Sequence, residues 1–451
     1  MYLNRLKNFI ITFLIFLAIY QTTELWFGNF STHSFFRLNS SIDDINIQKD
    51  TKYLMKSMLI NTGDNKFIRK YNNISNSDYK KIFDKAIYLA IKSGRTSYIE
   101  KFDIKQILDK KSVIYNYDFN IKVEDMPSLF NVRANNINKI KEFDTIIIMP
   151  VVDNKQGVST IFLSSETLEA CEVKTYRESL TQDIIDFINE FTTIEQKDFY
   201  YISSEESGIS LFSKNQFLLK EVGDKPNINL IKATNPLEQD GGILLSESEK
   251  YINVFFDSPL TKNSSFINNT YTYNDDNIIV KYYPYGVLEY VQYKSVINTN
   301  KEDSAYNIAL QFLEKDTNIK NEYYLKNYKK EDNKITFNFD YKINNFPIIL
   351  SKEKQEETGM ESMIEITIED GVVSKYKRII YDFSIEDSYV MLEKSFINAI
   401  DSFLLNNNKD IKNIDKMELV YVFDKVDVLT YIKWIINIEN NIYYEDVIYG
   451  G

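Results

Sequence analysis

The side chains that most often carry covalent or metal chemistry are scarce in this sequence. Cys171 is the single cysteine and His33 the single histidine among 451 residues. One cysteine forms no internal disulfide bond, and one histidine does not supply the two or more imidazoles of most catalytic zinc sites. A Cys171–His33 dyad is one interpretation. The sequence favours the other, in which Cys171 is a small buried hydrophobic residue and His33 lies in a solvated loop.

Carboxylates are abundant, and a glycosidase needs only two of them about 5 to 10 Å apart. The acidic runs Glu238–Asp240 and Glu353–Glu357 are typical of solvated loops or helix faces, since neither has the alternating oxygen ligands of a calcium-binding loop. Gly241 and Gly242 lack the spacing of a phosphate-binding loop. Trp434 is a candidate sugar platform, but core packing is the commoner role. We therefore expect that the protein is not an enzyme and needs neither a metal nor a cofactor.

Length and composition predict several folded domains that face water. The chain of 451 residues exceeds the roughly 100 to 200 residues of one domain. Its hydrophobic content of 44% and charged content of 26% are near the globular average. A net charge of -12 would repel a phosphate backbone, so nucleic acid is not an expected partner.

One apolar run stands out near the start of the chain. It is Phe9–Tyr20, and it follows the basic residues Arg5 and Lys7. The positive charge before it places the N-terminus in the cytoplasm. As a helix the run rises only about 18 Å, less than the roughly 30 Å hydrocarbon layer, so by itself it also fits the core of a signal peptide.

The flanks of this run favour a membrane anchor. The segment Leu6–Phe27 is long enough to span, with Lys7 able to reach the inner interface and Trp26 suited to the outer one. No A-x-A cleavage pattern follows the run, and no cysteine lies near it for lipid attachment. We expect a cytoplasmic tail at residues 1–8, a transmembrane helix at residues 9–28 and an extracytoplasmic remainder. The protein would thus cross the cell membrane once.

The expected transmembrane helix has one face that is more polar than the rest. Its residues recur at alternating spacings of four and three and are Asn8, Thr12, Ile15, Ile19, Thr22 and Trp26. Interhelical hydrogen bonds from such residues contribute about 0.6 to 2 kcal/mol in membranes, where no hydrophobic effect draws helices together. We interpret this polar stripe as a contact with a helix of another membrane protein. The alternative is a lone anchor that tolerates a few polar residues.

Apolar residues at helical spacing predict four helices in the remainder. They begin near Ser77, near Ser179, at Ala305 and near Ser384. Ser179 with Gln182 would form a capping box, and Ser384 with Asp387 would cap the fourth helix. The buried face of the fourth helix is expected to contain Tyr389, Leu392, Phe396, Ile400 and Phe403.

Alternation of apolar and polar residues predicts strands throughout the remainder. They are expected at Val113–Phe119, Thr145–Val152, Ser159–Leu163, three times within Thr270–Tyr293, at Ile335–Ile343, Phe346–Leu350, on both sides of Asp370-Gly371, and at Met417–Asp424, Tyr431–Ile438 and Ile442–Ile448. Asp-Gly between alternating strands is a strong hairpin signal. The fold class is therefore α+β: an N-terminal transmembrane helix followed by three mixed α+β domains with mostly antiparallel sheets, at residues 29–178, 179–299 and 300–451. In the last two domains a helix precedes a sheet and covers one of its faces.

Several short segments share their pattern with one known family. They are TTELWF at the end of the expected anchor, the strands TYTY and GVLEYVQY, and FDYKINNFPIIL followed by IEITIEDGVVSKYKRIIYDF. In these segments and in its layout the chain resembles the YycH family of two-component-system regulatory proteins. The C-terminal pattern is also similar to the sister family YycI.

The resemblance implies a membrane protein of a Gram-positive bacterium whose domains lie between the membrane and the cell wall. It implies two partners in the membrane, a YycI-like protein and the sensor histidine kinase YycG, also called WalK, which governs cell-wall homeostasis. In that family, contacts among transmembrane helices adjust the kinase, and no catalytic residues are carried over. The expected function is regulation of this kinase. The alternative is a membrane-tethered binding module for a cell-wall polymer or peptide.

Overall fold

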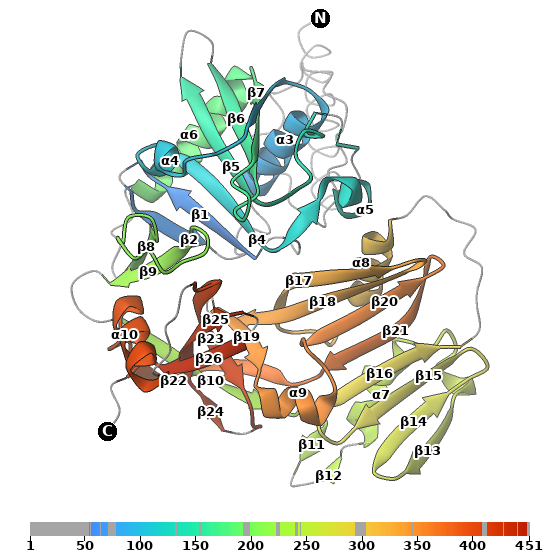
Figure 1. The fold of residues 1–451 in the computed structure, drawn as a ribbon. Coiled ribbons are helices and arrows are strands. Elements are labelled where there is room, and N and C mark those ends of the chain that lie inside the picture. The colour runs from blue at the N-terminus through green and yellow to red at the C-terminus, as the bar shows by residue number, and fades with distance from the viewer. Residues whose placement is uncertain are drawn as a thin grey trace, which may run out of the picture. The chain divides into compact units, whose positions relative to one another are not determined.

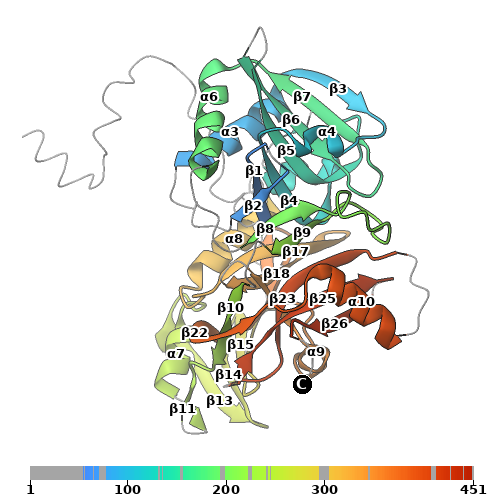
Figure 2. The same cartoon turned by 90° about the vertical axis from the view of Figure 1, so that its left-hand side faces the viewer.

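The structure is a computed structural model that describes most of the chain between Leu54 and Ile448. The described residues are 54, 56–63, 65–70, 78–130, 133–134, 136–152, 156–192, 199–221, 226–239, 242–243, 245–293, 304–343, 346–407, 413–426, 428–439 and 441–448. All of them belong to one compact unit, Ile47–Gly451, whose elements are labelled in Figures 1 and 2. Among these residues, none of the helices has the length and apolar character needed to cross a membrane.

The first sheet has nine strands, all paired antiparallel, in the order β3-β7-β6-β5-β4-β1-β2-β8-β9. Its strands are β1 Ser57–Asn61, β2 Phe67–Lys70, β3 Arg95–Ile99, β4 Ser112–Lys122, β5 Glu142–Val152, β6 Gln156–Leu163, β7 Ala170–Thr175, β8 Phe199–Ser203 and β9 Phe217–Glu221. Ile146, Ile147 and Ile148 of β5 point alternately to the two faces, and each is fully buried. Both faces at the centre of this sheet are therefore covered.

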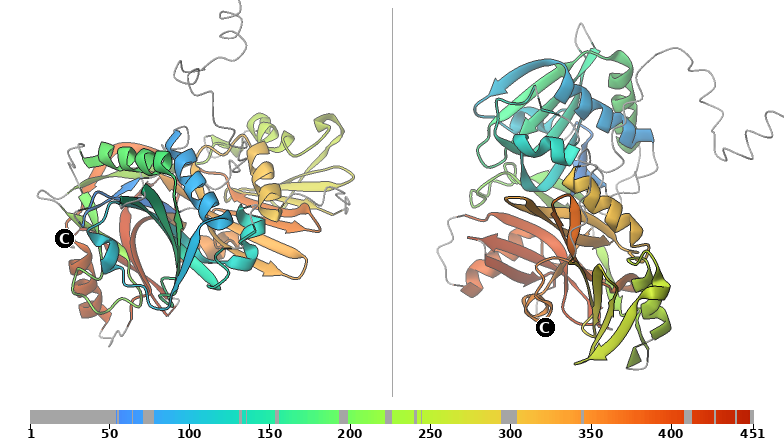
Figure 3. Two further views of the ribbon diagram at one scale, coloured as in Figure 1. Left: turned by 90° about the horizontal axis from the view of Figure 1, so that it is seen from above. Right: turned by 90° about the vertical axis from the view of Figure 1, so that its right-hand side faces the viewer.

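Helices α3 (Asp78–Lys92) and α6 (Glu178–Thr192) pack against each other and against this sheet (Figure 3). Phe83 of α3 meets Phe187 of α6 edge to face, with 4.9 Å between ring centroids. The helix predicted near Ser77 is thus confirmed. The predicted capping box of α6 is wrong, because the helix begins at Glu178 and Gln182 donates to Asp186 at 2.8 Å instead.

The second sheet has twelve strands and forks at β18. Its strands are β13 Asn263–Ile267, β14 Thr270–Asn274, β15 Ile278–Tyr283, β16 Val287–Gln292, β17 Glu322–Glu331, β18 Lys334–Ile343, β19 Phe346–Leu350, β20 Ile364–Glu369, β21 Val372–Ile379, β23 Lys416–Phe423, β25 Ile432–Ile438 and β26 Asn441–Asp446. Strand β17 occupies one edge of β18, while the other edge pairs with β20 along Lys334–Phe339 and with β19 along Tyr341–Ile343. One branch runs β20-β21-β16-β15-β14-β13 and the other β19-β23-β25-β26, where only β19 and β23 are parallel.

Asp340 lies at the point where the sheet forks, between the last residue that pairs with β20 and the first that pairs with β19. Its Oδ1 accepts a hydrogen bond from Met363 N at 3.2 Å, and its Oδ2 lies 3.0 Å from Lys326 Nζ. Lys326 is the extra residue of a bulge in β17, and bulges re-aim side chains. Burial raises the pKa of Asp340, and the nearby Lys326 opposes that effect. The ion pair with Lys326 of β17 and the hydrogen bond from Met363, the residue before β20, thus hold the Asp340 side chain at the fork.

Shorter elements complete the unit. The remaining helices are α4 Lys105–Leu108, α5 Met126–Phe130, α7 Leu245–Asn253, α8 Ala305–Lys315, α9 Lys352–Thr358 and α10 Phe396–Asn407, with 3₁₀ turns at Val123–Asp125 and Pro259–Thr261. Two small sheets are β22 (Asp382–Met391)-β10 (Asn227–Thr234)-β24 (Leu429–Thr430) and β11 (Glu238–Gln239)-β12 (Gly242–Ile243). Helix α8 lies against β18, β20 and β21 and α10 lies against β26, so each branch of the second sheet has a helix of its own.

The α+β class with mostly antiparallel sheets is confirmed, and so are most local elements. The three-stranded meander at β14, β15 and β16 pairs as expected, and the Asp370-Gly371 turn joins β20 to β21. Both turn residues have positive φ, 50° and 78°, as a tight hairpin turn requires. Strands β1, β2, β3, β7, β13 and β17 and helices α4, α5, α7 and α9 were not expected from the sequence.

The helix predicted to begin near Ser384 is wrong in its first half. Ser384, Asp387 and Tyr389 belong to β22, which pairs with β10 over most of its length. The helix, α10, begins only at Phe396, where Ser395 Oγ accepts from Asn398 N at 3.3 Å. Backbone hydrogen bonds from β10, a strand far away in the sequence, hold this segment extended. Local spacing does not reveal them.

Sheet membership divides the chain differently from the expected ranges 29–178, 179–299 and 300–451. The first sheet includes β8 and β9 and is covered by α6, so it extends to Glu221 and not to residue 178. The second sheet joins β13 to β16, from the range 179–299, to strands of the range 300–451 through the pairing of β16 with β21.

Gly286 is a position where a side chain would damage the fold. Its φ is +78°, and a Cβ built on it would lie 2.1 Å from Tyr381 Cζ. We predict that Gly286→Ala lowers the free energy of unfolding by about 3 kcal/mol or more, from left-handed strain and overpacking together. Gly371→Ala is the matched control, because its φ is also +78° but nothing lies within 4 Å of its Cβ. Gly371→Ala should lower the free energy of unfolding only by the left-handed backbone strain, about 1 to 2 kcal/mol. Urea unfolding of both variants measures the difference, and equal losses would contradict the packing argument.

Candidate functional site

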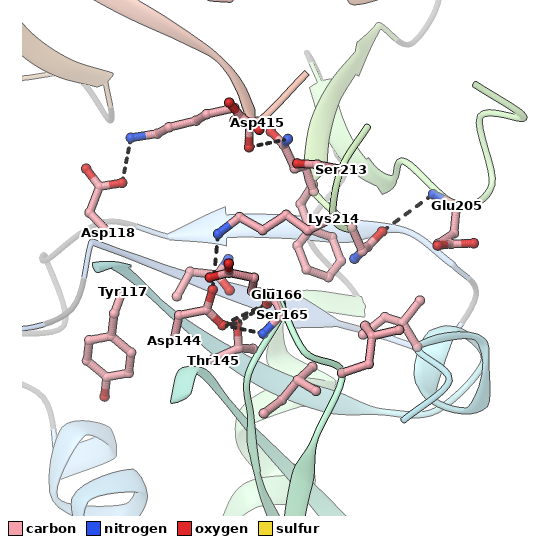
Figure 4. Close-up of a pocket in the computed structure, with 18 of the residues that line it drawn as sticks. Tyr117, Asp118, Asp144, Thr145, Ser165, Glu166, Glu205, Ser213, Lys214 and Asp415 are labelled. Carbon is pink, nitrogen blue, oxygen red and sulfur yellow. Dashed lines mark hydrogen bonds and ion pairs between the residues drawn. The ribbon is translucent and has the colours of Figure 1, made fainter. Parts of the chain in front are cut away.

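A cavity of about 750 Å³ lies between the first sheet and the β23 branch of the second sheet. Its walls come from β1, β4 and β5, from the connection between β8 and β9, and from the start of β23 (Figure 4). We call it the intersheet cavity. Ligand pockets commonly have about 300 to 1,000 Å³, so a small molecule would fit.

Four charged side chains from the two sheets form a closed ring in one wall of this cavity. Lys56 Nζ lies 3.0 Å from Asp118 Oδ1 and 2.6 Å from Glu418 Oε2. Lys416 Nζ lies 2.6 Å from Asp118 Oδ1 and 2.9 Å from Glu418 Oε1. Each ammonium group therefore contacts both carboxylates. We call these four residues the charge quartet.

Local strand geometry places each member of the quartet. Lys56 directly precedes β1 and its N donates to Asn116 O at 2.9 Å. Asp118 is two residues after Asn116 on β4, so the two side chains project from the same face, and both line the cavity. Lys416 and Glu418 are two residues apart on β23 and so project from the same face.

Burial and mutual attraction compete in the quartet. The exposed fractions of the side chains are 9% for Lys56, 9% for Asp118, 12% for Glu418 and 34% for Lys416. Burial alone would raise the pKa of both carboxyl groups, but the two ammonium groups, Lys416 first, outweigh it and hold each pKa below its usual value. Burial lowers the pKa of Lys56, despite its carboxylate neighbours. Burial would do the same to Lys416, but Asp118 and Glu418 prevail and its pKa is raised.

The connection between β8 and β9 attaches to the chain just before β23. Ser213 N donates to Ile414 O at 3.0 Å. Gln216 uses both ends of its amide: Nε2 donates to Asp415 O at 3.0 Å, and Oε1 accepts from Met417 N at 2.8 Å. These backbone bonds fix the residues around Lys416 against the first sheet.

A second ion pair lies in the cavity wall and involves Asp144. Its Oδ1 accepts from Ser165 N at 3.0 Å and from Ser165 Oγ at 2.7 Å. Its Oδ2 lies 3.3 Å from Lys214 Nζ, which reaches across from the β8–β9 connection (Figure 4). Asp144 is thus neutralised and held by hydrogen bonds.

A further contact joins the two sheets outside the cavity. Tyr328 Oη donates to Asp125 Oδ2 at 2.6 Å, and Lys330 Nζ lies 3.0 Å from Asp125 Oδ1. The Tyr328 ring meets that of Phe119 edge to face at 5.4 Å. Burial first, and then the hydrogen bond to Asp125, raise the pKa of Tyr328, so its hydroxyl stays a donor.

The arrangement is suited to holding two sheets together, because the charges of the quartet and those of Asp144 and Lys214 are paired with one another. Among the described residues no group of three His, Cys, Asp or Glu side chains is placed to hold a metal ion. Cys171 is fully buried, as expected, and burial raises its pKa, which disfavours the reactive thiolate. Trp434 is 1% exposed and donates to Lys394 O at 3.0 Å. Its expected place in the core is confirmed, and it offers no sugar platform.

The residues that the sequence singled out do not overlap with this cavity. His33 and the polar stripe lie outside the described residues, and the stripe stays a prediction: Asn8, Thr12, Ile15, Ile19, Thr22 and Trp26. The charge quartet was not expected. Its one local signal in the sequence is the spacing of two between Lys416 and Glu418 on a predicted strand. The neighbouring sequence does not indicate that these residues pair with side chains some 300 residues away.

Comparisons with known proteins identify the fold. No family model and no curated protein sequence matches the chain. The crystal structure of YycH from Bacillus subtilis matches it with a TM-score of 0.54, covering 88% of this chain and 97% of YycH. The chain has a YycH-like fold. Sequence identity to YycH is 13%, so the similarity concerns the fold, and the resemblance is confirmed at that level.

The charge quartet provides a test of buried electrostatics. We predict that Lys56→Met lowers the free energy of unfolding by about 3 to 5 kcal/mol, because the two buried carboxylates then share the single ammonium group of Lys416 and one negative charge is left uncompensated. The double variant Lys56→Met/Glu418→Met should lower the free energy of unfolding by less than the sum for the two single variants. The remaining pair, Lys416 with Asp118, has no net charge. Lys433→Met is the control: its partner Asp446 lies 3.1 Å away but both are exposed, at 37% and 64%, and it should cost less than about 1 kcal/mol. Equal losses for Lys56→Met and Lys433→Met in urea unfolding would contradict the prediction.

The lowered pKa of Asp118 predicts a pH dependence. Its folded pKa lies below the unfolded value of about 3.9. The ionised group therefore stabilises the fold fully above about pH 5, and this contribution is lost as the pH falls through the folded pKa. Asp118→Asn should flatten the decline of unfolding free energy between about pH 5 and pH 3, whereas the exposed Asp446→Asn should change it far less. Parallel pH profiles for wild type and Asp118→Asn would exclude this role.

Proposed function

We propose that the protein is a membrane-anchored extracytoplasmic regulator of a YycG/WalK-type sensor histidine kinase, and that it works with a YycI-like partner. The observation that carries the proposal is the YycH-like fold, which covers 88% of the chain and 97% of YycH. One fold can host unrelated functions, so a second argument is needed. It is the apolar run Phe9–Tyr20 behind Arg5 and Lys7, whose charge pattern favours an anchor with a cytoplasmic N-terminus.

A regulator of this kind must bind one state of the kinase better than the other, and it needs no catalytic chemistry of its own. A partner that binds one state of a kinase better by about 1 to 3 kcal/mol changes the active population several-fold. The polar stripe of the expected anchor is a candidate for that contact. The described unit has its two sheets joined by the charge quartet, by Gln216 and by Asp125, and these contacts resist separation of the sheets when a partner binds either one.

The intersheet cavity favours a second candidate function, a membrane-tethered binding module for a cell-wall polymer or peptide. The two candidates differ in what they require of the anchor. A kinase regulator needs the particular residues of its transmembrane helix, whereas a binding module needs only to be held at the membrane.

The anchor is therefore the place to test the proposal. We predict that Asn8→Leu/Thr12→Leu/Thr22→Leu weakens co-purification with the kinase from membranes by about 20-fold, since each polar contact contributes about 0.6 kcal/mol. Kinase autophosphorylation should shift toward its level without the protein. Ile10→Leu/Leu17→Ile, on the opposite face of the expected helix, is the matched control and should change neither quantity. Full regulation by a chain whose residues 6–27 are replaced with an unrelated anchor would reject the proposal and favour the binding module.

A further inference from the structure

Strand β13 forms one end of the second sheet, and its outer edge has no partner among the strands that the structure describes (Figure 1). It pairs only with β14, and each of its residues, Asn263–Ile267, is exposed. The outer edge of such a strand presents a row of backbone N–H and C=O groups, which is a template for a further strand. What this edge recognises is therefore an extended segment of polypeptide.

The other sheet edges in the described part of the chain have protection that β13 lacks. Natural edge strands are very short, bulged or charged, because these features oppose pairing with another chain. Strands β11, β12 and β24 have two residues each. The longer edge strands contain charged residues: Arg95 in β3, Lys220 and Glu221 in β9, Lys326, Lys329 and Lys330 among others in β17, Glu445 and Asp446 in β26, and Asp382, Glu386 and Asp387 in β22, which also has a bulge. Strand β13, with the sequence NSSFI, has no charge, no proline and no bulge.

The uncharged surface extends beyond β13. No residue from Asn263 to Asn274, a segment that contains β13, its turn and β14, is charged, although 26% of the whole chain is. Partners of different sequence are commonly selected by opposite charge. In a two-fold symmetric pair each surface meets its own copy, so charged groups near the axis would face charges of the same sign. A neutral edge in a chain of net charge -12 therefore favours a second copy of the chain as the partner.

The exposed ring of Phe266 also favours pairing of β13 with its own copy. It lies opposite Tyr271 of β14, with 4.4 Å between ring centroids. On the same face, Tyr273 Oη lies 3.2 Å from Ser248 Oγ of α7, so this helix lies over the face at β14, but Phe266 remains 54% exposed. In an antiparallel pair centred on Ser265, the two Phe266 residues are diagonal neighbours about 7 to 8 Å apart, within reach of aromatic side chains. Such a pair would cover both rings.

From these observations we infer that two copies of the chain associate through β13, whose two strands pair antiparallel about a two-fold axis at Ser265. This register pairs every residue of the strand: Asn263 with Ile267, Ser264 with Phe266, and Ser265 with its own copy. The second sheets of the two copies then form one continuous sheet. Because the pair uses the open edge of both copies, the assembly closes at two. This interface goes beyond the proposed function, since it involves neither the kinase nor the expected anchor.

Disulfide crosslinking of the full chain tests the register. The one cysteine of the chain, Cys171, is fully buried, so a cysteine introduced at the surface is the accessible one. Facing residues of antiparallel strands have Cα atoms about 4.5 to 5.5 Å apart, within the roughly 4.4 to 6.8 Å of disulfide bonds. Under mild oxidation Ser265→Cys should form a disulfide-linked dimer at least about tenfold faster than Ser388→Cys, because pairing holds its two thiols together. Ser388 is the matched control, an exposed serine on the charged edge strand β22.

Sedimentation of the full chain in detergent measures the association itself. The wild-type chain should dimerise at micromolar concentration. Ser265→Lys/Phe266→Lys should weaken dimerisation about tenfold, through like charges that face each other and through loss of the apolar contact. Ser388→Lys/Tyr389→Lys is the matched control, because it adds the same charge to exposed positions of another edge strand, and it should leave dimerisation unchanged. Thermal unfolding of each variant separates lost association from lost folding.

The inference is overturned by any of three results: a wild-type chain that stays monomeric at high micromolar concentration, equal effects of the two double-lysine variants on dimerisation, or equal crosslinking rates for the two cysteine variants. Equal effects of the lysine variants would place the association elsewhere in the chain. Neither measurement includes a kinase. Its failure is therefore distinct from failure of the proposed regulation, and each can stand without the other.

Discussion

The arrangement of this protein depends on a ring of four alternating charges between two sheets. Moving a single charge out of water costs several kcal/mol even after relaxation. The charge quartet offsets this cost only because Lys56, Asp118, Lys416 and Glu418 each contact two partners of opposite sign. A displacement of β23 by one residue would turn Lys416 and Glu418 to the opposite face. The ring thus specifies one docking of the two sheets more strongly than it adds to stability.

Buried charges recur at the other junctions of the fold. Asp340 and Lys326 meet where the second sheet forks. Under α8, Arg378 Nε lies 3.2 Å from Asp316 Oδ2, and both residues are almost fully buried. Hydrophobic packing is non-directional and tolerates many arrangements. An ion pair buried away from water tolerates few arrangements. It is therefore suited to positions where one strand could pair with several neighbouring strands.

The sequence reveals the local part of this fold and not its long-range part. Alternation in Ile335–Ile343 and the Asp370-Gly371 turn predict their strands, because those signals depend on adjacent residues. Ser384 and Asp387 suggest a helix start, yet β10 holds that segment extended. The charge quartet is likewise formed by residues that are far apart in the sequence. Asp118 lies on β4, and Lys416 reaches it from almost 300 residues later in the chain.

A fold shared with YycH at 13% identity limits what can be transferred between the two proteins. Hydrophobic periodicity and turn chemistry suffice to keep an α+β architecture while most side chains change. The residues of the charge quartet are under a different constraint, because each buried charge is compensated only while all four are present. The intersheet cavity is built from such residues, among them Lys56 and Glu418. The chemistry of the cavity therefore follows from the side chains of this chain, and similarity of fold does not specify it.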